Sequence, residues 1–276
     1  MTAPTPSPAP HSYVSPIPVR RAHLGDALAS EWTKIRSLRS TMWTLGVMVL
    51  LMLGVGFGVA LIVAAASEYP AENESALGMG FFGLLLGSIC VMTLGVLTIA
   101  SEYGTGMIRT TLTACPSRGR VLLAKAIVFF ALVFTITTLT ATVVAVAQVA
   151  LVSGPEPTVD QWLRATVGAG LFLALTGLVS LAVGTLIRHS AGAITIMIGV
   201  MLMPLVAAMF MMAESLSGVR DWLLAYALPS QMIALYSSVP VEGASGPTGW
   251  DPVWIMLVLA LGALGGAFAV LNSRDV

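Results

Sequence analysis

The side chains that most often carry protein chemistry are few in this chain and do not combine into a recognisable site. Its two cysteines, Cys90 and Cys115, lie in an apolar run and in a connection, so the sequence offers no disulfide framework. The three histidines, His11, His23 and His189, stand far from one another and form no metal-ligand spacing. We therefore expect no metal site, and we expect both cysteines to be reduced and structural.

Motifs for intramembrane hydrolysis and for nucleotide binding are also missing from the sequence. It contains no HExxH, no GxSG with a partner histidine and no pair of acidic residues within an apolar run. No GxxxxGKS/T loop occurs, and the only two lysines, Lys34 and Lys125, lie in the wrong context for one. The sequence thus predicts that the chain is not an enzyme, that it holds no cofactor and that any nucleotide chemistry belongs to another polypeptide.

The most specific polar stretch is the connection SEYGTGMIRTTLTACPSRGRVLLAK at residues 101–125. Its glycines permit a sharp change of direction, and Thr105 is suited to cap a new helix. Residues 107–114 are long enough for about two helical turns before Pro116 stops the helix. A short helix held rigidly between two membrane spans is what a soluble partner needs in order to push on a membrane domain.

Six apolar runs dominate the chain, and each is long enough to cross a membrane. A run of about 20 residues spans roughly 30 Å of hydrocarbon at about 1.5 Å per residue. The runs cover residues 45–66, 77–100, 126–152, 165–187, 191–213 and 253–271. They hold half of the 276 residues, so the sequence predicts one membrane domain without a separate soluble domain.

The distribution of charge predicts how the six spans are oriented, because cytoplasmic flanks retain basic residues during insertion. Alternate connections hold most of the 13 Lys and Arg residues, namely Arg20, Arg21, Lys34, Arg36, Arg39, Arg109, Arg118, Arg120, Lys125, Arg188 and Arg274. The opposite connections hold only Arg164 and Arg220, together with most of the acidic residues. We assign the basic set to the cytoplasm, so both termini are predicted to be cytoplasmic.

The residues before the first span divide into two parts. Residues 1–21 are rich in proline and poor in apolar partners, so we expect a disordered tail. Over residues 22–42 apolar side chains recur at steps of three or four, which predicts an amphipathic helix in the inner leaflet boundary, followed by the six-span domain at 43–276. The interfacial residues of this helix are Trp32, Lys34, Arg36 and Arg39. The alternative is a solvated flank that only follows the charge rule.

Two other connections carry structural signals. Only residues 188–190 separate the fourth and fifth spans, so these spans are predicted to form a tight cytoplasmic hairpin. The long outer connection at 214–252 contains two short amphipathic pieces separated by Pro229, neither of which is long enough to span. We expect them to be interfacial or re-entrant helices on the outer face.

Polar groups inside the apolar runs are restricted to hydroxyls and one amide, and none of the runs contains a charged residue or a histidine. This argues against an ion-coupled carrier, which needs such groups at mid-depth. Gln148 is the amide, and because an unsatisfied amide in lipid is costly it should contact another helix or a transport pathway. Glycines four residues apart predict close helix packing or a dimer at Gly54 and Gly58, Gly83 and Gly87, and Gly262 and Gly266.

The chain from about Leu28 onward resembles the permease subunits of ABC-2 type transporters. The resemblance rests on SEWTKIRSLRS before the first span, SEYGTGMIRTTLTACPSRGR after the second, LPSQMIALYSS in the outer connection and the six-span layout. It implies that residues 31–40 lie in an elbow helix and that a coupling helix faces an ATPase. The coupling region would contain Glu102, Gly104, Thr105, Arg109, Pro116 and Arg118. It also implies that two permease copies, identical or related, pair with two ATPase subunits.

The expected fold is therefore an all-α integral membrane protein with six transmembrane helices, an N-terminal interfacial helix, a cytoplasmic coupling helix and an extracellular re-entrant or amphipathic segment. The expected function is that of a permease subunit in an ATP-driven ABC exporter of the prokaryotic plasma membrane, with membrane lipids but no nucleic acid among its partners. Because the spans are uncharged, an apolar or amphipathic cargo is favoured. A self-contained channel or secondary carrier and a non-transporting membrane anchor are the alternatives.

Two residues of the coupling region carry the sharpest expectation. Replacing Glu102 or Arg109 should uncouple transport while leaving membrane insertion intact. The competing interpretation is that Glu102 and Arg109 only cap helix ends or pair with each other.

Overall fold

A computed structural model describes residues 23–66, 75–115, 117–237 and 246–273. The described residues form helices and no strand, which confirms the all-α prediction. Within these ranges six helices are long and apolar enough to cross a membrane. They are α2 (Arg39–Ala66), α3 (Gly80–Gly104), α5 (Arg118–Leu151), α7 (Ala169–Ile187), α8 (Ser190–Phe210) and α11 (Asp251–Ser273). The predicted Pro-rich tail lies outside the described residues.

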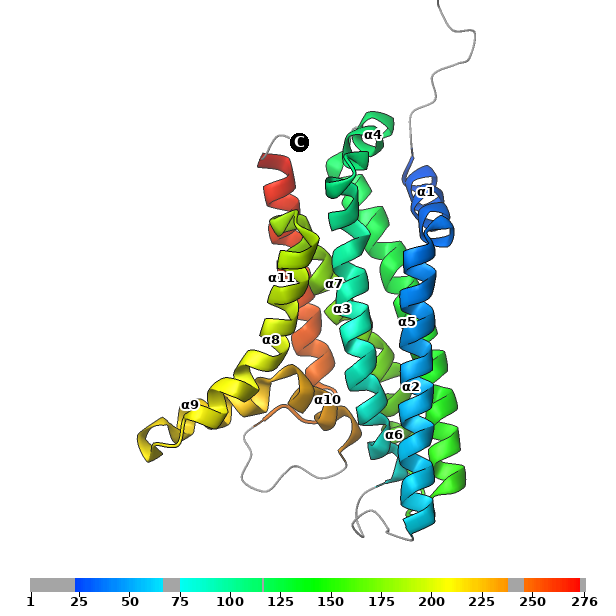
Figure 1. Cartoon of the computed structure of the whole chain (residues 1–276), viewed down its shortest axis with the longest axis vertical. Helices are drawn as coiled ribbons and strands as arrows, with labels where there is room; N and C mark the ends of the chain where they lie inside the picture. Colours follow the sequence, from blue (N-terminus) through cyan, green and yellow to red (C-terminus); the bar gives the residue numbers. More distant parts are fainter. Residues whose placement is uncertain (1–22, 67–74, 116, 238–245, 274–276) are drawn as a thin grey trace, which may run out of the picture.

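The long helices run side by side around α7, which packs against α3, α5, α8 and α11 (Figure 1). One end of the bundle carries two short helices, α1 (Leu24–Ser37) and α4 (Met107–Ala114), together with the end of α11. We call this the inner end, because the basic connections lie there. The opposite, outer end carries α6 (Val159–Leu163), α9 (Ser217–Tyr226) and α10 (Leu228–Tyr236).

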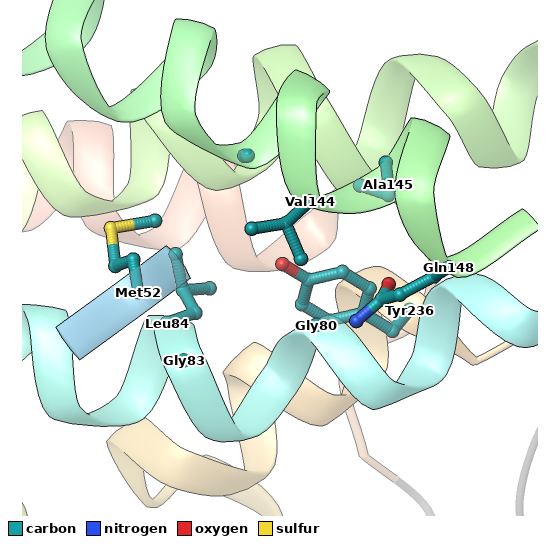
Figure 2. Close-up of a pocket in the computed structure, with 10 residues that line it drawn as sticks. Met52, Gly80, Gly83, Leu84, Val144, Ala145, Gln148 and Tyr236 are labelled. Atoms are coloured by element: carbon teal, nitrogen blue, oxygen red, sulfur yellow. The ribbon is translucent and has the colours of Figure 1, made fainter. Parts of the chain in front are cut away.

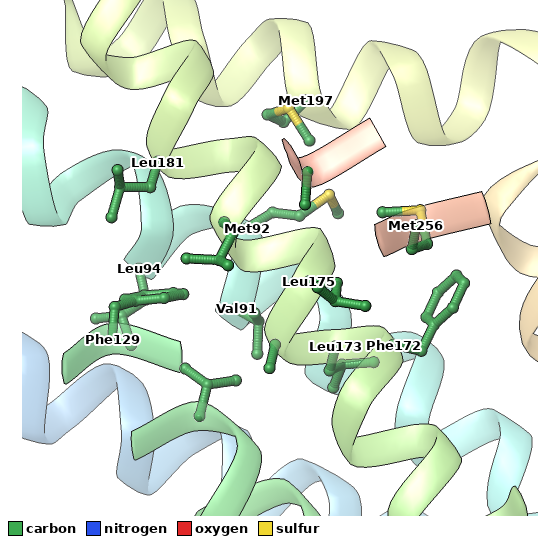
Figure 3. Packing of buried hydrophobic residues seen from close by; sticks show 14 of the residues in the cluster. Val91, Met92, Leu94, Phe129, Phe172, Leu173, Leu175, Leu181, Met197 and Met256 are labelled. Carbon is green, nitrogen blue, oxygen red and sulfur yellow. The ribbon is translucent and has the colours of Figure 1, made fainter. Parts of the chain in front are cut away.

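The core is apolar and centres on α7 (Figure 3). Phe172 and Leu173 of α7 are fully buried, and Phe172 lies toward Met256 of α11. Val91 of α3 and Phe129 of α5 pack against Gly177 of α7. The peripheral helices behave differently, since α2 leaves Trp43 75% exposed along with many other large apolar residues. Such a surface suits lipid rather than water, because lipid tails are as apolar as the side chains that face them.

Several helices begin or end away from their predicted bounds at the inner end. Helix α1 ends at Ser37 and the chain turns at Leu38, so the first membrane helix begins before the predicted start at residue 45. Helices α3 and α5 extend past the apolar runs to include Glu102 and Lys125. The expectation of membrane helices without charge is therefore wrong for the helices as they fold.

The hairpin and the outer segment agree with the sequence in outline. Helix α7 ends at Ile187 and α8 begins at Ser190, which confirms the tight hairpin. Helices α9 and α10 are the two predicted short pieces, but the chain breaks between them at Ala227. Pro229 instead occupies the first turn of α10, where its missing N–H is not needed.

One of the three predicted glycine pairs makes a close helix contact inside the chain. Gly83 and Gly87 of α3 lie against the backbone and side chain of Met52 on α2. The other four glycines, Gly54, Gly58, Gly262 and Gly266, have no described atom of the chain within 4 Å of a Cβ position. The closest approach of a described glycine to the backbone of another helix was not predicted. It joins Gly95 of α3 to Gly177 of α7, where a Cβ on Gly95 would overlap the carbonyl oxygen of Gly177.

We expect Gly95→Ala to lower the stability of the bundle by about 1–3 kcal/mol, because the added methyl forces α3 away from α7. The matched variant Gly54→Ala should be neutral or stabilising by up to about 1 kcal/mol, because alanine favours the helix and meets open space there. Thermal unfolding of the purified variants in detergent measures both effects. Equal melting temperatures for the two would contradict the crossing described here.

Candidate functional site

Four charged side chains from three helices meet at the inner end, and we call them the inner charge network. The Lys125 Nζ of α5 lies 2.6 Å from Glu31 Oε2 of α1 and 2.9 Å from Glu102 Oε1 of α3. The Lys34 Nζ of α1 lies 2.7 Å from Glu31 Oε1 and 2.9 Å from the same oxygen of Glu102. Each ammonium therefore contacts both carboxylates, and the four charges sum to zero.

The inner charge network is buried, which determines its energetics. The Lys125 side chain is 2% exposed and both glutamate side chains are 4% exposed, whereas Lys34 is 21% exposed. Removing an ion from water costs several kcal/mol, so a buried charge persists only with partners at hydrogen-bond distance. Contacts within the network meet this requirement for both ammonium groups, for Glu31 and for Glu102 Oε1, whereas Glu102 Oε2 is buried without a hydrogen-bond partner among the described residues.

Lys34 remains charged in this setting. Burial lowers the pKa of its ammonium group, but the hydrogen bonds and negative charges of Glu31 and Glu102 outweigh that effect. The pKa of Lys34 therefore lies above its ordinary value, and the ammonium group is protonated at neutral pH.

The network extends to the short helix α4. Lys34 Nζ also donates a hydrogen bond to Thr111 Oγ1 of α4, at 3.2 Å. Helix α4 further buries Ile108 on its bundle side. The sharp turn before it is made by Gly106, whose φ of 73° lies in the left-handed region that favours glycine. Helix α4 is therefore joined by a hydrogen bond to the charges that connect α1, α3 and α5.

Two of the residues predicted to form the site belong to this network, namely Glu102 and Lys34. Arg109 does not pair with Glu102, because the carboxylate of Glu102 contacts the two lysines and Arg109 is exposed on α4. The competing interpretation that Glu102 and Arg109 form a pair is thus wrong. Trp32, Arg36 and Arg39 are exposed around the inner end.

The remaining predicted residues have structural positions around α4. Gly104 is the last residue of α3, and Pro116 lies outside the described residues. The prediction that Thr105 caps α4 is wrong. Its Oγ1 donates to the carbonyl of Ser101, and Gly106 occupies the cap position. Arg118 donates a hydrogen bond of 2.7 Å to the carbonyl of Leu271, which ties α5 to the end of α11.

Sequence reasoning missed Glu31 and Lys125 as site residues. Both were counted only as part of a charged flank or a connection. A usable signal existed, since Glu31 and Lys34 are spaced to share a helix face and Lys125 directly adjoins an apolar run. A charge at the edge of an apolar run needs a partner, and Glu31 and Glu102 are acids on the same predicted side of the membrane as Lys125.

A second buried charge lies at the outer end. Arg164 sits in a short π-helical turn (Arg164–Gly168) between α6 and α7, and its Nε donates to Asp160 Oδ2 at 2.7 Å. Its Nη1 donates to the carbonyl of Ser237 at 2.9 Å, just beyond α10. Asp160 also accepts a hydrogen bond of 3.0 Å from the Trp250 indole. Arg164 thus connects α6 to the end of α10, and Asp160 connects α6 to Trp250 just before α11.

Gln148 of α5 is buried beside the outer segment (Figure 2). Its Nε2 lies 3.5 Å from the carbonyl oxygen of Gly56 on α2, which is a long hydrogen bond between helices. Its side chain and that of Tyr236 from α10 line the same cavity of about 10 Å³, room for about one water molecule. In this conformation the cavity is too small to pass a cargo.

A larger groove of about 640 Å³ lies between α5, α7 and α11. Its walls are aliphatic and aromatic, and they include Phe130, Leu175 and Leu257. Trp250 and Trp254 line the part near the outer end, where tryptophan suits the boundary between lipid and water.

The fold and the inner end define a multi-pass membrane protein with a short helix fixed to its bundle by buried charge. A family model described as ABC-2 family transporter protein matches residues 27–204, which is more than half of the chain. The chain belongs to the ABC-2 transporter family, and it is a membrane permease of an ABC transporter. No curated protein is similar enough in sequence to count as a match.

We expect Lys125→Met to destabilise the protein by about 3–5 kcal/mol, because Glu31 and Glu102 lose the cation buried between them. Lys34→Met serves as the matched variant and should cost about 1 kcal/mol, since its partially exposed site admits water. Both values are measured as thermal unfolding of the detergent-purified chain. A Lys125→Met protein as stable as Lys34→Met would show that the network is not buried as described.

Proposed function

We propose that this permease is driven by a separate ATPase subunit that contacts α4 from the cytoplasm. The observation that carries the proposal is the contact of Lys34 with Glu31, Glu102 and Thr111, which joins α4 to the network. A docking helix that moved independently of the bundle would transmit no work. Here the first residues to respond to a displacement of α4 are the charges that fix α1, α3 and α5.

The mechanism follows from the distance dependence of buried ion pairs. Charge interactions in a low-dielectric site weaken as ions separate, and a separated buried ion regains no hydration. When the ATPase displaces α4, the favourable response is for the network to move as a unit. Helices α1, α3 and α5 then tilt together, and α2 follows because it packs against α3 and α5.

The exposed side of α4 supplies the contact surface for the ATPase. Arg109, Thr110 and Thr113 are exposed there, whereas Ile108 is buried. We assign to the ATPase a shallow groove with an acidic residue opposite Arg109. Nucleotide hydrolysis belongs to that subunit, and this chain holds no cofactor in the proposal.

The assembly contains two permease copies in the cell membrane of a prokaryote, in line with the dimers typical of the family. Helices α2, α3 and α8 line the interface in this proposal. The exposed apolar sides of α2 and α8 leave room for such a contact.

The cargo is apolar or amphipathic and moves outward. The groove between α5, α7 and α11 supports this class, because its apolar walls match an acyl or aromatic group. The buried charges do not provide an ion site, since those of the inner network neutralise one another and Arg164 is paired with Asp160.

We expect Arg109→Glu to abolish co-purification of an ATPase carrying GxxxxGKS/T, and to abolish the ATPase activity that the permease stimulates, because it places an acid opposite an acid. Arg220→Glu is the matched control, since Arg220 is 36% exposed at the outer end and, among the described residues, pairs with its neighbour Asp221 in the same helix. Both variants should unfold at the temperature of the wild type.

Flux measurements in liposomes, combined with this binding assay, separate the alternatives. A chain that supports flux in liposomes without any ATPase is a self-contained channel or carrier, and a chain that binds the ATPase without transport is an anchor. Retained ATPase binding in Arg109→Glu, with binding lost in Arg220→Glu, would exclude α4 as the docking helix.

Filling the groove between α5, α7 and α11 with a larger side chain tests whether the cargo binds there. Leu257→Trp should reduce ATP-dependent accumulation of a fluorescent amphipathic dye in inside-out vesicles, by about tenfold if the lost apolar contact is worth 1–2 kcal/mol. Val258→Trp is the control, because Val258 is 70% exposed on the lipid-facing side of the same helix. Equal transport by the two variants would remove the groove from the pathway, and accumulation only in right-side-out vesicles would reverse the direction.

A further inference from the structure

The α7–α8 hairpin at the inner end contains a strained residue that the coupling mechanism does not use. Arg188 has a φ of 59°, and it is the one non-glycine residue with positive φ within the described ranges. It follows the end of α7, a position at which glycine commonly adopts this left-handed conformation without steric cost. An arginine at this position is strained, so the surroundings of its side chain are informative.

The side chain of Arg188 has hydrogen-bonding groups without acceptors. Its guanidinium carbon lies 5.0 Å from the centre of the Tyr103 ring on α3. The Nε and Nη2 atoms are buried, and neither has a hydrogen-bond partner among the described residues. The Tyr103 hydroxyl is also buried; it interacts with the Arg188 guanidinium group, and its own O–H has no acceptor within the described part of the chain. Unsatisfied buried donors are rare and costly, so this group of donors is suited to an acceptor from outside the chain.

The electrostatic surroundings specify the charge of that acceptor. Arg118 contributes a second positive charge close to Tyr103. The nearby carboxylate of Glu102 places its Oε1 on Lys34 and Lys125, whose two positive charges outweigh its single negative charge, although its Oε2 has no hydrogen-bond partner among the described residues. Donors and positive charge therefore face the same region, and this combination binds an anion.

The depth of the hairpin identifies where the anion comes from. Arg188 directly follows the apolar helix α7, so it lies at the boundary of the hydrocarbon. Figure 1 shows the inner end of α8 below the tip of α4. Only 22% of the apolar window of α8 is buried within the chain, so this helix has apolar surface for lipid beside the hairpin as well as for the second permease copy proposed above. A lipid headgroup reaches such a position more readily than a soluble subunit docked on α4.

We propose that Arg188 and Tyr103 form a binding site for the phosphate of an anionic phospholipid in the inner leaflet. The planar guanidinium group donates two hydrogen bonds to one phosphate, and the tyrosine hydroxyl donates a third. Inorganic phosphate shares this chemistry but lacks the acyl chains that would lie along α8. The bound lipid links the end of α3 to the α7–α8 hairpin.

The test measures the affinity of the full chain, purified in detergent, for dioctanoyl phosphatidylglycerol, dioctanoyl phosphatidylcholine and inorganic phosphate. The wild type should bind phosphatidylglycerol at least about tenfold more tightly than the other two. Arg188→Gln should weaken this binding by at least about tenfold, and Tyr103→Phe by about fivefold, following the strengths of charged and neutral hydrogen bonds. Arg109→Gln is the control, because it removes the same charge from an exposed position on α4 and should leave the affinity within about twofold.

Three results would overturn the lipid site. Equal losses in Arg188→Gln and Arg109→Gln would mean that the lipid is held by general attraction to a basic surface. Inorganic phosphate binding as tightly as phosphatidylglycerol would mean that the site takes a free anion. Unchanged lipid affinity in Arg188→Gln, accompanied by loss of the ATPase, would mean that the hairpin contacts the partner subunit.

Arg188→Gly separates loss of the site from loss of the fold. Glycine relieves the left-handed strain, so this variant should unfold at the same temperature as the wild type or above it. It should nevertheless lose phosphatidylglycerol as Arg188→Gln does. A folded Arg188→Gly protein that binds the lipid normally would refute the assignment of Arg188.

Discussion

The ammonium group of Lys125 is buried at the inner end of the membrane bundle, and the arrangement of helices there depends on its neutralisation. An ion in this position requires carboxylates at contact distance, and Glu31 and Glu102 supply them from two other helices. That requirement fixes α1 against α5 and fixes the end of α3 between them. Lys34 balances the second negative charge and reaches Thr111, so the position of α4 follows from the same constraint.

The membrane helices and the breaks between them could be predicted because hydropathy and turn signals are local properties of a sequence. The two-residue hairpin and the pair of outer helices are examples. The inner ends of α3 and α5 could not be predicted in this way, because a hydropathy run stops at a charge whether or not that charge is paired. Glu31 and Lys125 are 94 residues apart in the sequence, so no local pattern reports that they neutralise each other.

The candidate site shows the same division. Glu102 and Lys34 were identified from the sequence because they lie in motifs of the family, whereas their contact with Lys125 is a product of tertiary packing. Which glycines approach another helix was equally undetermined, since Gly83 and Gly54 have the same spacing pattern but only Gly83 faces a neighbour. A spacing rule specifies a helix face, but the position of the neighbouring helix depends on the whole bundle.

Buried charge at both ends of the bundle limits the motions available to it. At the outer end Arg164 connects α6 and α7 to α10, and at the inner end the four-residue network connects α1, α3 and α5. Between these ends the helices meet through apolar side chains, whose contacts in lipid are non-directional and have no hydrophobic driving force. Sliding or tilting of the middle is therefore less costly than separation of either end. In the proposed mechanism, a force applied through α4 is consequently expressed as movement of whole helices, which is the response that a separate ATPase subunit would have to produce.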